Sequence, residues 1–393
     1  MLVERAVAGS PRMRSWQLAL LLVTTGLGLT SLNLALPVLP LVVTRATHEA
    51  SIAGIVTAVV AAGTVALELQ TSRLLRRARP TTFLPAAIAL QMVAMAGFAL
   101  NPPLPAMLIL GGLTGAGFGA VATVTVNMVS GLAPPGRQGE AIGYYGLAVS
   151  TPAIIAPPVA LVVLSAQGPS AVFLIGAGCC LAGVLLATRL TPAAAAAAAP
   201  VGGTLATLGR WPVLLMWLSF VCVTVTYGAT VSFTPFLLGT SGLGSAPVFL
   251  LVFGITRATS RVLSGHLVDR LGDRRLALPG LIVGALALTL LPAHSAPLTI
   301  ASAAVYGGAF GAVQTAAFFG MLRSAGPGRS QHISGIWNMA VDVGFGAGAL
   351  LLAPLAASVG YAGMFWTLPV LFALSLAVRI AAERSLAPGS PRG

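Results

Sequence analysis

The stretch Gly265-His-Leu-Val-Asp269-Arg270-Leu-Gly272-Asp-Arg274-Arg275 is a short charged segment between two long apolar runs. One run covers about residues 247–268 and the other about residues 276–292. A helix crosses a bilayer with roughly 20 mostly apolar residues, and each run is close to that length. Because charged side chains are costly in lipid, the stretch predicts a turn at the membrane surface that joins two spanning helices.

The same alternation of apolar run and polar break extends over the whole chain of 393 residues. Hydrophobic residues make up 57% of the chain and charged residues only 7%, whereas a soluble domain has about 25% charged residues. The pattern predicts an all-α membrane protein with twelve transmembrane helices in two pseudo-symmetric six-helix bundles. The predicted spans are about residues 16–43, 52–70, 83–101, 104–131, 141–164, 170–188, 211–238, 247–268, 276–292, 298–322, 333–357 and 362–381.

The longest break divides the chain into two halves. It contains seven alanines (193–199) between Pro192 and Pro200, followed by two glycines, and proline and glycine interrupt helices. We therefore expect an N-terminal tail (1–15), an N-terminal bundle (16–188), a linker (189–210), a C-terminal bundle (211–381) and a C-terminal tail (382–393).

The distribution of arginines predicts the topology. The chain has no lysine and a formal net charge of +13, and its arginines gather in alternate gaps. One side collects Arg73, Arg76, Arg77, Arg79, Arg137, Arg189, Arg210, Arg270, Arg274, Arg275, Arg323 and Arg329, and the other side only Arg45. The positive-inside rule then predicts a multi-pass protein of the plasma (inner) membrane with both termini in the cytoplasm, and no nucleic acid is needed to explain the charge.

Corresponding segments recur in the two halves. Gly143-Tyr-Tyr-Gly and Gly335-Ile-Trp-Asn each open a predicted helix after an arginine-containing loop. Ser72-Arg-Leu-Leu-Arg-Arg aligns with Gly265-His-Leu-Val-Asp-Arg. Two parallel six-helix repeats are typical of transporters, with the substrate site near the midplane between them.

The charged turn resembles the signature loop of the major facilitator superfamily, G-x-L-x-D-R-x-G-x-R-R. It matches at Gly265, Asp269, Arg270, Gly272, Arg274 and Arg275, at the expected place between the second and third helices of a half. The stretch from Pro134 to Gly146 is similar to the loop that enters the fifth helix in drug-efflux and arabinose-efflux-permease-like members. The resemblance implies that Asp269 meets the start of the fifth helix across the two halves. The alternative is that these arginines only set the topology.

The sequence also departs from that family pattern. In the first-half loop Arg76 stands where the aspartate is expected, so a second latch of this kind is not expected. Leu108 stands where efflux members carry an arginine linked to proton coupling, and Ala156-Pro157-Pro158 replaces Gly-Pro-Pro in the fifth helix. Proton antiport through the arginine of the family pattern therefore does not carry over.

Four charged residues stand out inside the predicted spans, namely Glu68, Arg257, Arg261 and Asp342. Each costs about 2.5–3.5 kcal/mol on insertion scales, so each is a functional candidate. Three interpretations stay open: Asp342 pairs with an arginine, Asp342 is a proton site, or Arg257 binds an anionic part of the substrate. For Arg261 the alternative interpretation is a structural role, because residues at this position are often basic in the superfamily.

Uncharged polar residues complete the candidate site: Asn33, Asn127, Tyr227, Gln314, Trp337 and Asn338. The resemblance implies that the first, fourth, seventh and tenth helices line the cavity, which favours Asn33, Tyr227 and Gln314. The alternative is hydrogen bonding between helices, worth about 0.6 kcal/mol on average.

These features predict a secondary active transporter, an exporter of a small amphipathic or hydrophobic molecule by alternating access, with protons as the candidate coupling ion. Uptake or facilitated diffusion of a metabolite is the alternative, and a membrane-embedded enzyme or a lipid flippase is a remote one. The four histidines and three cysteines form no catalytic or metal-binding spacing, so we expect no enzyme, no cofactor and no metal. The expected partners are the small-molecule substrate, membrane lipid and protons, with the protein as a monomer.

Overall fold

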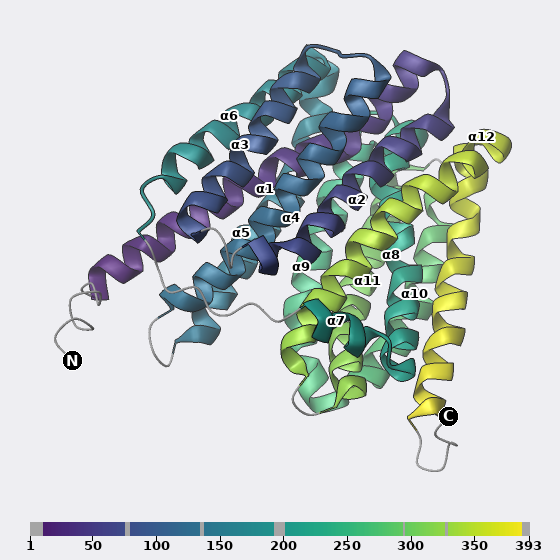
Figure 1. Ribbon diagram of the computed structural model, residues 1–393. Helices are drawn as coiled ribbons and strands as arrows, with labels where there is room; N and C mark the ends of the chain where they lie inside the picture. Colours follow the sequence, from purple (N-terminus) through teal and green to yellow (C-terminus); the bar gives the residue numbers. More distant parts are fainter. Residues whose placement is uncertain are drawn as a thin grey trace.

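The computed structural model describes residues 11–74, 79–133, 137–191, 201–293, 295–326 and 329–386. All regular structure in these ranges is helical (Figure 1). The elements are α1 (Pro11–Thr47), α2 (Ala50–Leu74), α3 (Pro80–Ala99), α4 (Leu104–Leu132), α5 (Gln138–Gln167), α6 (Pro169–Ala187), α7 (Val201–Leu208), α8 (Trp211–Leu238), α9 (Ala246–Leu271), α10 (Asp273–Thr289), a short 3-10 turn (Leu291–Ala293), α11 (Ala296–Ala325) and α12 (Ser330–Ser385).

Eleven helical segments in the described ranges are long and apolar enough to cross a membrane, and the last one is double. That segment, His332–Ser385, has 54 residues and contains Gly360 with φ 75°. A positive φ breaks the helical path and suits glycine, which has no Cβ to clash. Gly360 therefore separates two spans within α12, at the break predicted between residues 357 and 362. The predicted all-α fold with twelve spanning helices is confirmed.

The segment predicted as a linker contains a short helix that the sequence did not predict. Val201–Leu208 forms α7, and the hydroxyl of Thr204 lies 3.2 Å from Nδ1 of His332 at the start of α12. The alanine run 193–199 and Arg76 of the first-half loop lie outside the described residues.

The two halves meet along pairs of helices, chiefly α2 with α12 and α5 with α9. Glycine lets α2 and α12 approach closely, since a Cβ built on Gly54 would lie 2.3 Å from the carbonyl oxygen of Ala349. Farther along the same contact, a Cβ on Gly346 would lie 2.6 Å from the Cβ of Ala61. Small residues at such contacts are how membrane helices pack tightly.

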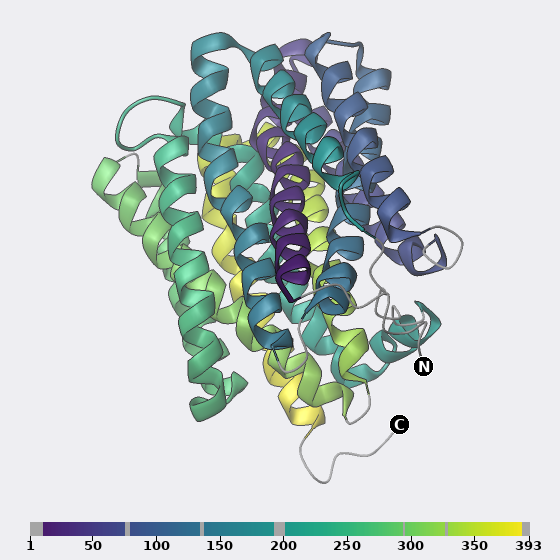
Figure 2. The same ribbon diagram turned by 90° about the vertical axis from the view of Figure 1, so that its left-hand side faces the viewer.

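The start of α1 and the end of α12 lie on the same side of the molecule, which we call the terminal face (Figures 1 and 2). Near this face the end of α5 is uncovered on several sides, because Ile142, Tyr144 and Leu147 are all exposed. The facing end of α9 is also uncovered, with 62% of Val262 exposed. Toward the terminal face the helices of the two halves diverge (Figure 1), whereas Gly54 brings them together near the opposite face.

The two halves have different interiors. The C-terminal half buries many aromatic side chains, and Tyr306, with its hydroxyl 2.9 Å from that of Thr226, lies among them. The N-terminal half packs α2 on α4 through glycines, and a Cβ on Gly115 would lie 1.9 Å from the carbonyl oxygen of Val60. As a result, the aromatic and cationic groups of the candidate site lie in one half.

Candidate functional site

The signature loop lies at the terminal face, where α9 turns into α10. Gly272 has φ 78° and separates the two helices, a conformation that explains glycine at this position. Asp269, Arg270, Arg274 and Arg275 are exposed, and Gly265 has open space around it. Within the described residues Asp269 makes no hydrogen bond or ion pair. The contact of Asp269 with the start of α5 is absent from this conformation and stays a prediction for one in which the two helix ends meet.

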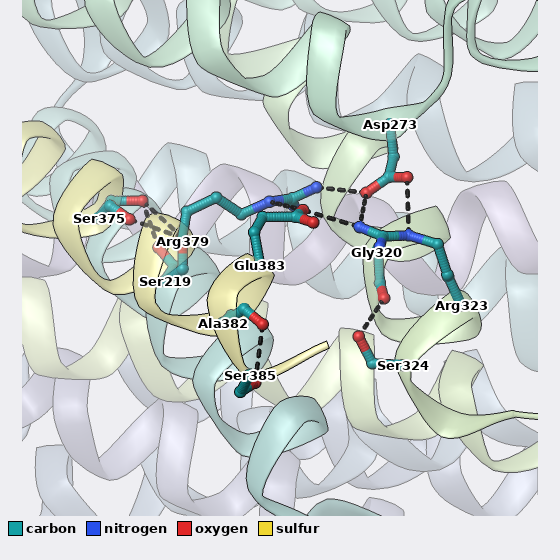
Figure 3. A network of polar contacts seen from close by, with 10 residues as sticks. All are labelled: Ser219, Asp273, Gly320, Arg323, Ser324, Ser375, Arg379, Ala382, Glu383 and Ser385. Carbon is teal, nitrogen blue, oxygen red and sulfur yellow. Dashed lines mark hydrogen bonds and ion pairs between the residues drawn. The ribbon is translucent and has the colours of Figure 1, made fainter. Parts of the chain in front are cut away.

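A residue of the loop that the sequence analysis passed over, Asp273, anchors a network of four charges (Figure 3). Arg323 of α11 binds Asp273 through two hydrogen bonds of 3.1 and 3.0 Å, and it binds Glu383 of α12 at 2.7 Å. Arg379 of α12 is 3% exposed and contacts the same two carboxylates. The network ties the terminal-face ends of α10, α11 and α12 together. The i, i+4 spacing of Arg379 and Glu383 was the signal in the sequence for part of it.

The two carboxyl groups predicted inside the membrane lie against each other. The carboxyl groups of Glu68 of α2 and Asp342 of α12 are close enough to interact with each other, so the pair bridges the two halves. An ionised carboxylate only accepts hydrogen bonds, so a bond between two carboxyl groups requires a proton on at least one of them. Both side chains are half-buried rather than sealed. The sequence identified each residue separately but did not predict their pairing.

The N-terminal half holds Glu68 in a fitted position. A Cβ on Gly119 of α4 would lie 3.1 Å from Cγ of Glu68, so glycine leaves the space that this side chain occupies. Tyr145 of α5 donates its hydroxyl to the carbonyl oxygen of Ala122 at 3.0 Å and interacts electrostatically with Glu68. Three helices of one half thus position a carboxyl group toward the other half.

The two intramembrane arginines lie one turn apart on α9 and contact aromatic rings. The Arg257 guanidinium is 5.0 Å from the ring centre of Tyr227 and 5.7 Å from that of Phe253. The Arg261 guanidinium is 5.5 Å from the ring centre of Trp337. These distances are within the range of cation–π attraction. The possible pairing of an arginine with Asp342 is not found among the described ion pairs, because Asp342 faces Glu68 instead.

The arginines and the carboxyl pair lie at the same level of the molecule. Trp337, which contacts Arg261, precedes Asp342 on α12 by little more than one turn. Phe345 follows Asp342 by one turn, and its ring centre is 5.5 Å from that of Tyr227, which contacts Arg257. One stretch of α12 therefore joins the two groups of charges.

Some of the uncharged candidate residues hydrogen-bond within their own helix, and others contact residues of the candidate site. Asn33 and Asn127 donate to carbonyl oxygens of their own helices, both at 2.8 Å, so these amides do not bridge helices through that bond. Gln314 is buried, its side-chain oxygen has no partner, and its backbone carbonyl accepts from Nε1 of Trp337 at 3.0 Å. Asn338 is exposed. Within the described chain, no group of three His, Cys, Asp or Glu side chains is placed to hold a metal ion.

Two bundles of six helices, with a pair of carboxyl groups where they meet, are the architecture of alternating-access membrane transporters. The sequence matches the Major Facilitator Superfamily over residues 19–267 and 249–392. The chain belongs to this superfamily.

Solved structures show the same fold at low sequence identity. A bacterial homologue of the human lysosomal transporter Spinster, in an inward-facing and unoccupied conformation, superposes with a TM-score of 0.84 at 13% identity, covering 96% of this chain and 98% of that chain. The nucleoside transporter NupG gives 0.78 at 12% identity, covering 94% and 100%. A D-xylose–proton symporter gives 0.74 at 16% identity, covering 92% and 96%. These structures show the fold, and the family match makes the chain a transporter.

Proposed function

We propose that the chain is a proton-coupled exporter of a small amphipathic molecule in the plasma (inner) membrane, with the terminal face in the cytoplasm. The observation that carries the proposal is the Glu68–Asp342 pair, a protonatable contact between the two halves at the level of the candidate site. Alternating access requires α2 and α12 to separate when the opposite face opens. The pair is therefore made and broken once in every cycle.

The proton on the pair decides how stable this contact is. With one proton shared, the contact contributes a charge-assisted hydrogen bond. With both groups ionised the contact is repulsive: two like unit charges at a generic contact distance of about 3 Å repel by on the order of 5 kcal/mol at an effective dielectric constant of about 20. A difference of that size is enough to reverse a two-state equilibrium from about 1:99 to about 99:1.

This linkage gives a cycle for export. Protons from outside protonate the carboxyl groups, which closes the opposite face and opens the terminal face. The pair can then lose its proton to the cytoplasm, because both side chains are only half-buried. The contact becomes repulsive, and the opposite face reopens. A substrate bound in the terminal-face opening is carried out during that step, in exchange for the proton that entered.

The coupling can be tested first without a substrate. Spin labels at His48→Cys and Ser358→Cys, both exposed near the opposite face on different halves, report its opening in a background without the native cysteines. Alkaline pH should lengthen the distance between the labels in the parent protein. Asp342→Asn and Glu68→Gln should keep it short at every pH, while Glu49→Gln, an exposed carboxyl outside the pair, should behave like the parent. A distance that does not respond to pH would contradict the proposal.

Transport is tested in proteoliposomes with an imposed pH gradient. The probes are lipophilic cations, neutral amphiphiles and amphipathic anions of matched size. Gradient-driven exchange in the parent protein that is lost in Asp342→Asn is the expected result, with Glu49→Gln as control. Movement of the probe down its own gradient, indifferent to pH, would instead identify a facilitator for uptake or equilibration.

A further inference from the structure

Arg257 and Arg261 are unusual in combining aromatic contact with unused hydrogen-bonding capacity. Each guanidinium has five N–H donors at its edge. Across the part of the chain that the structure describes, no hydrogen bond or ion pair involves either group. Cation–π attraction uses the face of the guanidinium and leaves the edge donors unsatisfied.

The two charges also repel each other. They are four residues apart on one helix, on the same side, and the structure places them close enough to interact electrostatically. Both side chains are half-buried, so water reaches them in this conformation. When the terminal face closes around them, that water is excluded, and a buried charge without a partner is strongly disfavoured.

In this conformation none of the described acidic residues pairs with Arg257 or Arg261. The chain contains eight Asp and Glu residues. Glu4 lies outside the described residues, and Glu49 and Asp269 are exposed. Three others are in ion pairs: Glu140 with Arg137, and Asp273 and Glu383 with Arg323 and Arg379. The remaining two, Glu68 and Asp342, contact each other. In this conformation the arginines therefore lack a counter-charge among the described residues, and a bound anion would supply it.

We propose that Arg257 and Arg261 form a binding site for the oxyanion of an amphipathic substrate, a carboxylate, sulfonate or phosphate monoester. Two guanidinium groups match the planar or forked oxygens of such anions through bidentate hydrogen bonds. The rings of Tyr227, Phe253 and Trp337 then contact the apolar part of the same molecule. The inference rests on the proposed transport function and narrows its substrate from any amphiphile to an anionic one.

Trp337 provides a reporter, because its ring lies against Arg261. A heavy-atom quencher such as 4-iodobenzoate, bound at the arginines, should quench it saturably in detergent micelles without any pH gradient. Subtracting the fluorescence of the Trp337→Phe variant removes the contribution of the other four tryptophans. The neutral isostere 4-iodobenzamide partitions similarly but lacks the charge, so it should give no saturable quenching.

Substitutions then assign the anion to the two arginines. Arg257→Gln and Arg261→Gln should each weaken 4-iodobenzoate binding roughly 10-fold or more, the usual effect of losing a charged hydrogen bond. Arg189→Gln, at an exposed arginine near the terminal face, should not change it. If a glutamine variant fails to fold, the lysine variant keeps the charge without the fork and should bind with intermediate affinity. Asp342→Asn should retain anion binding while losing proton coupling, so failure of one proposal is distinguishable from failure of the other.

A second arm distinguishes a soluble anion from a lipid headgroup. Dihexanoyl phosphatidate that displaces 4-iodobenzoate from the arginines would support the site and identify a phospholipid as its source of oxyanion. Binding of 4-iodobenzoate that resists displacement would support a soluble organic anion. Equal quenching by the acid and the amide, or unchanged affinity in both glutamine variants, would overturn the proposal.

Discussion

A single methyl group at Gly54 should drive the protein out of the conformation described here. The Cβ of Gly54→Ala would lie 2.3 Å from the carbonyl oxygen of Ala349 and 2.8 Å from the Cβ of Ala353. A carbon and a carbonyl oxygen normally stay about 3.3 Å apart or more, so α2 and α12 must move apart by about 1 Å. Backbone atoms of a packed helix cannot yield as a flexible side chain does.

The cost of such overpacking is about 1–3 kcal/mol. It arises only while α2 and α12 touch, so it falls on the conformation closed at the opposite face and not on one in which that face is open. A free energy of that size changes the ratio of the two conformations about 5- to 150-fold. The variant should therefore populate the conformation open at the opposite face, with its overall stability little changed.

Distance measurements between spin labels can detect this change in population. A pair near the opposite face, at His48 and Ser358, should lengthen, and a pair at Tyr144 of α5 and Val262 of α9 should shorten. Gly178→Ala is the matched control, because nothing lies within 4 Å of the added Cβ. Unchanged distributions at both pairs, in a Gly54→Ala protein that stays folded, would show that this contact does not hold the opposite face closed.

Two further predictions concern stability. Arg379→Met leaves two mostly buried carboxylates without one of their partners, so we expect the free energy of unfolding to fall by about 3 kcal/mol. The melting temperature in detergent should be lower than for Arg384→Met, a change at an exposed arginine. Equal melting temperatures would contradict this account. The Cβ of Gly344→Ala would lie 1.8 Å from the hydroxyl of Thr224 inside the C-terminal half, so this variant should melt lower than Gly308→Ala, where nothing lies within 4 Å, and a parent-like melting temperature would refute the packing argument.

Much of the fold follows from the sequence because lipid imposes a simple rule on it. Apolar length predicted the spans, and Gly360 divides α12 at the break expected between residues 357 and 362. The charged turn at Gly272 was recognisable because charges leave the bilayer and glycine allows a positive φ. The helix α7 was missed because eight residues beside a proline-punctuated alanine run give no clear period.

The site was harder to predict because its contacts join distant residues. Glu68 and Asp342 are each conspicuous as charges in lipid, but their partnership depends on how α2 packs against α12. The sequence left open that Asp342 pairs with an arginine, because a position along a helix does not say which neighbouring helix its side chain faces. Asp273 gave no signal, since a charge at the membrane surface usually points to water rather than to a buried arginine.

The separation of carboxyl pair and arginines has a consequence for coupling. If one group bound both the proton and the substrate, these two ligands would compete directly for that group. Here the carboxyl pair that we propose as the proton site bridges the halves, while Arg257 and Arg261 belong to one half and move with it. In the mechanism we propose, the proton controls which face is open, and the substrate controls whether closing around the arginines is favourable, because its oxyanion supplies their counter-charge. On this argument an amphipathic anion should shift the equilibrium toward closed conformations even in Asp342→Asn, whereas pH should not shift that variant at all; an anion effect that disappears in Asp342→Asn would show that the two sites act as one.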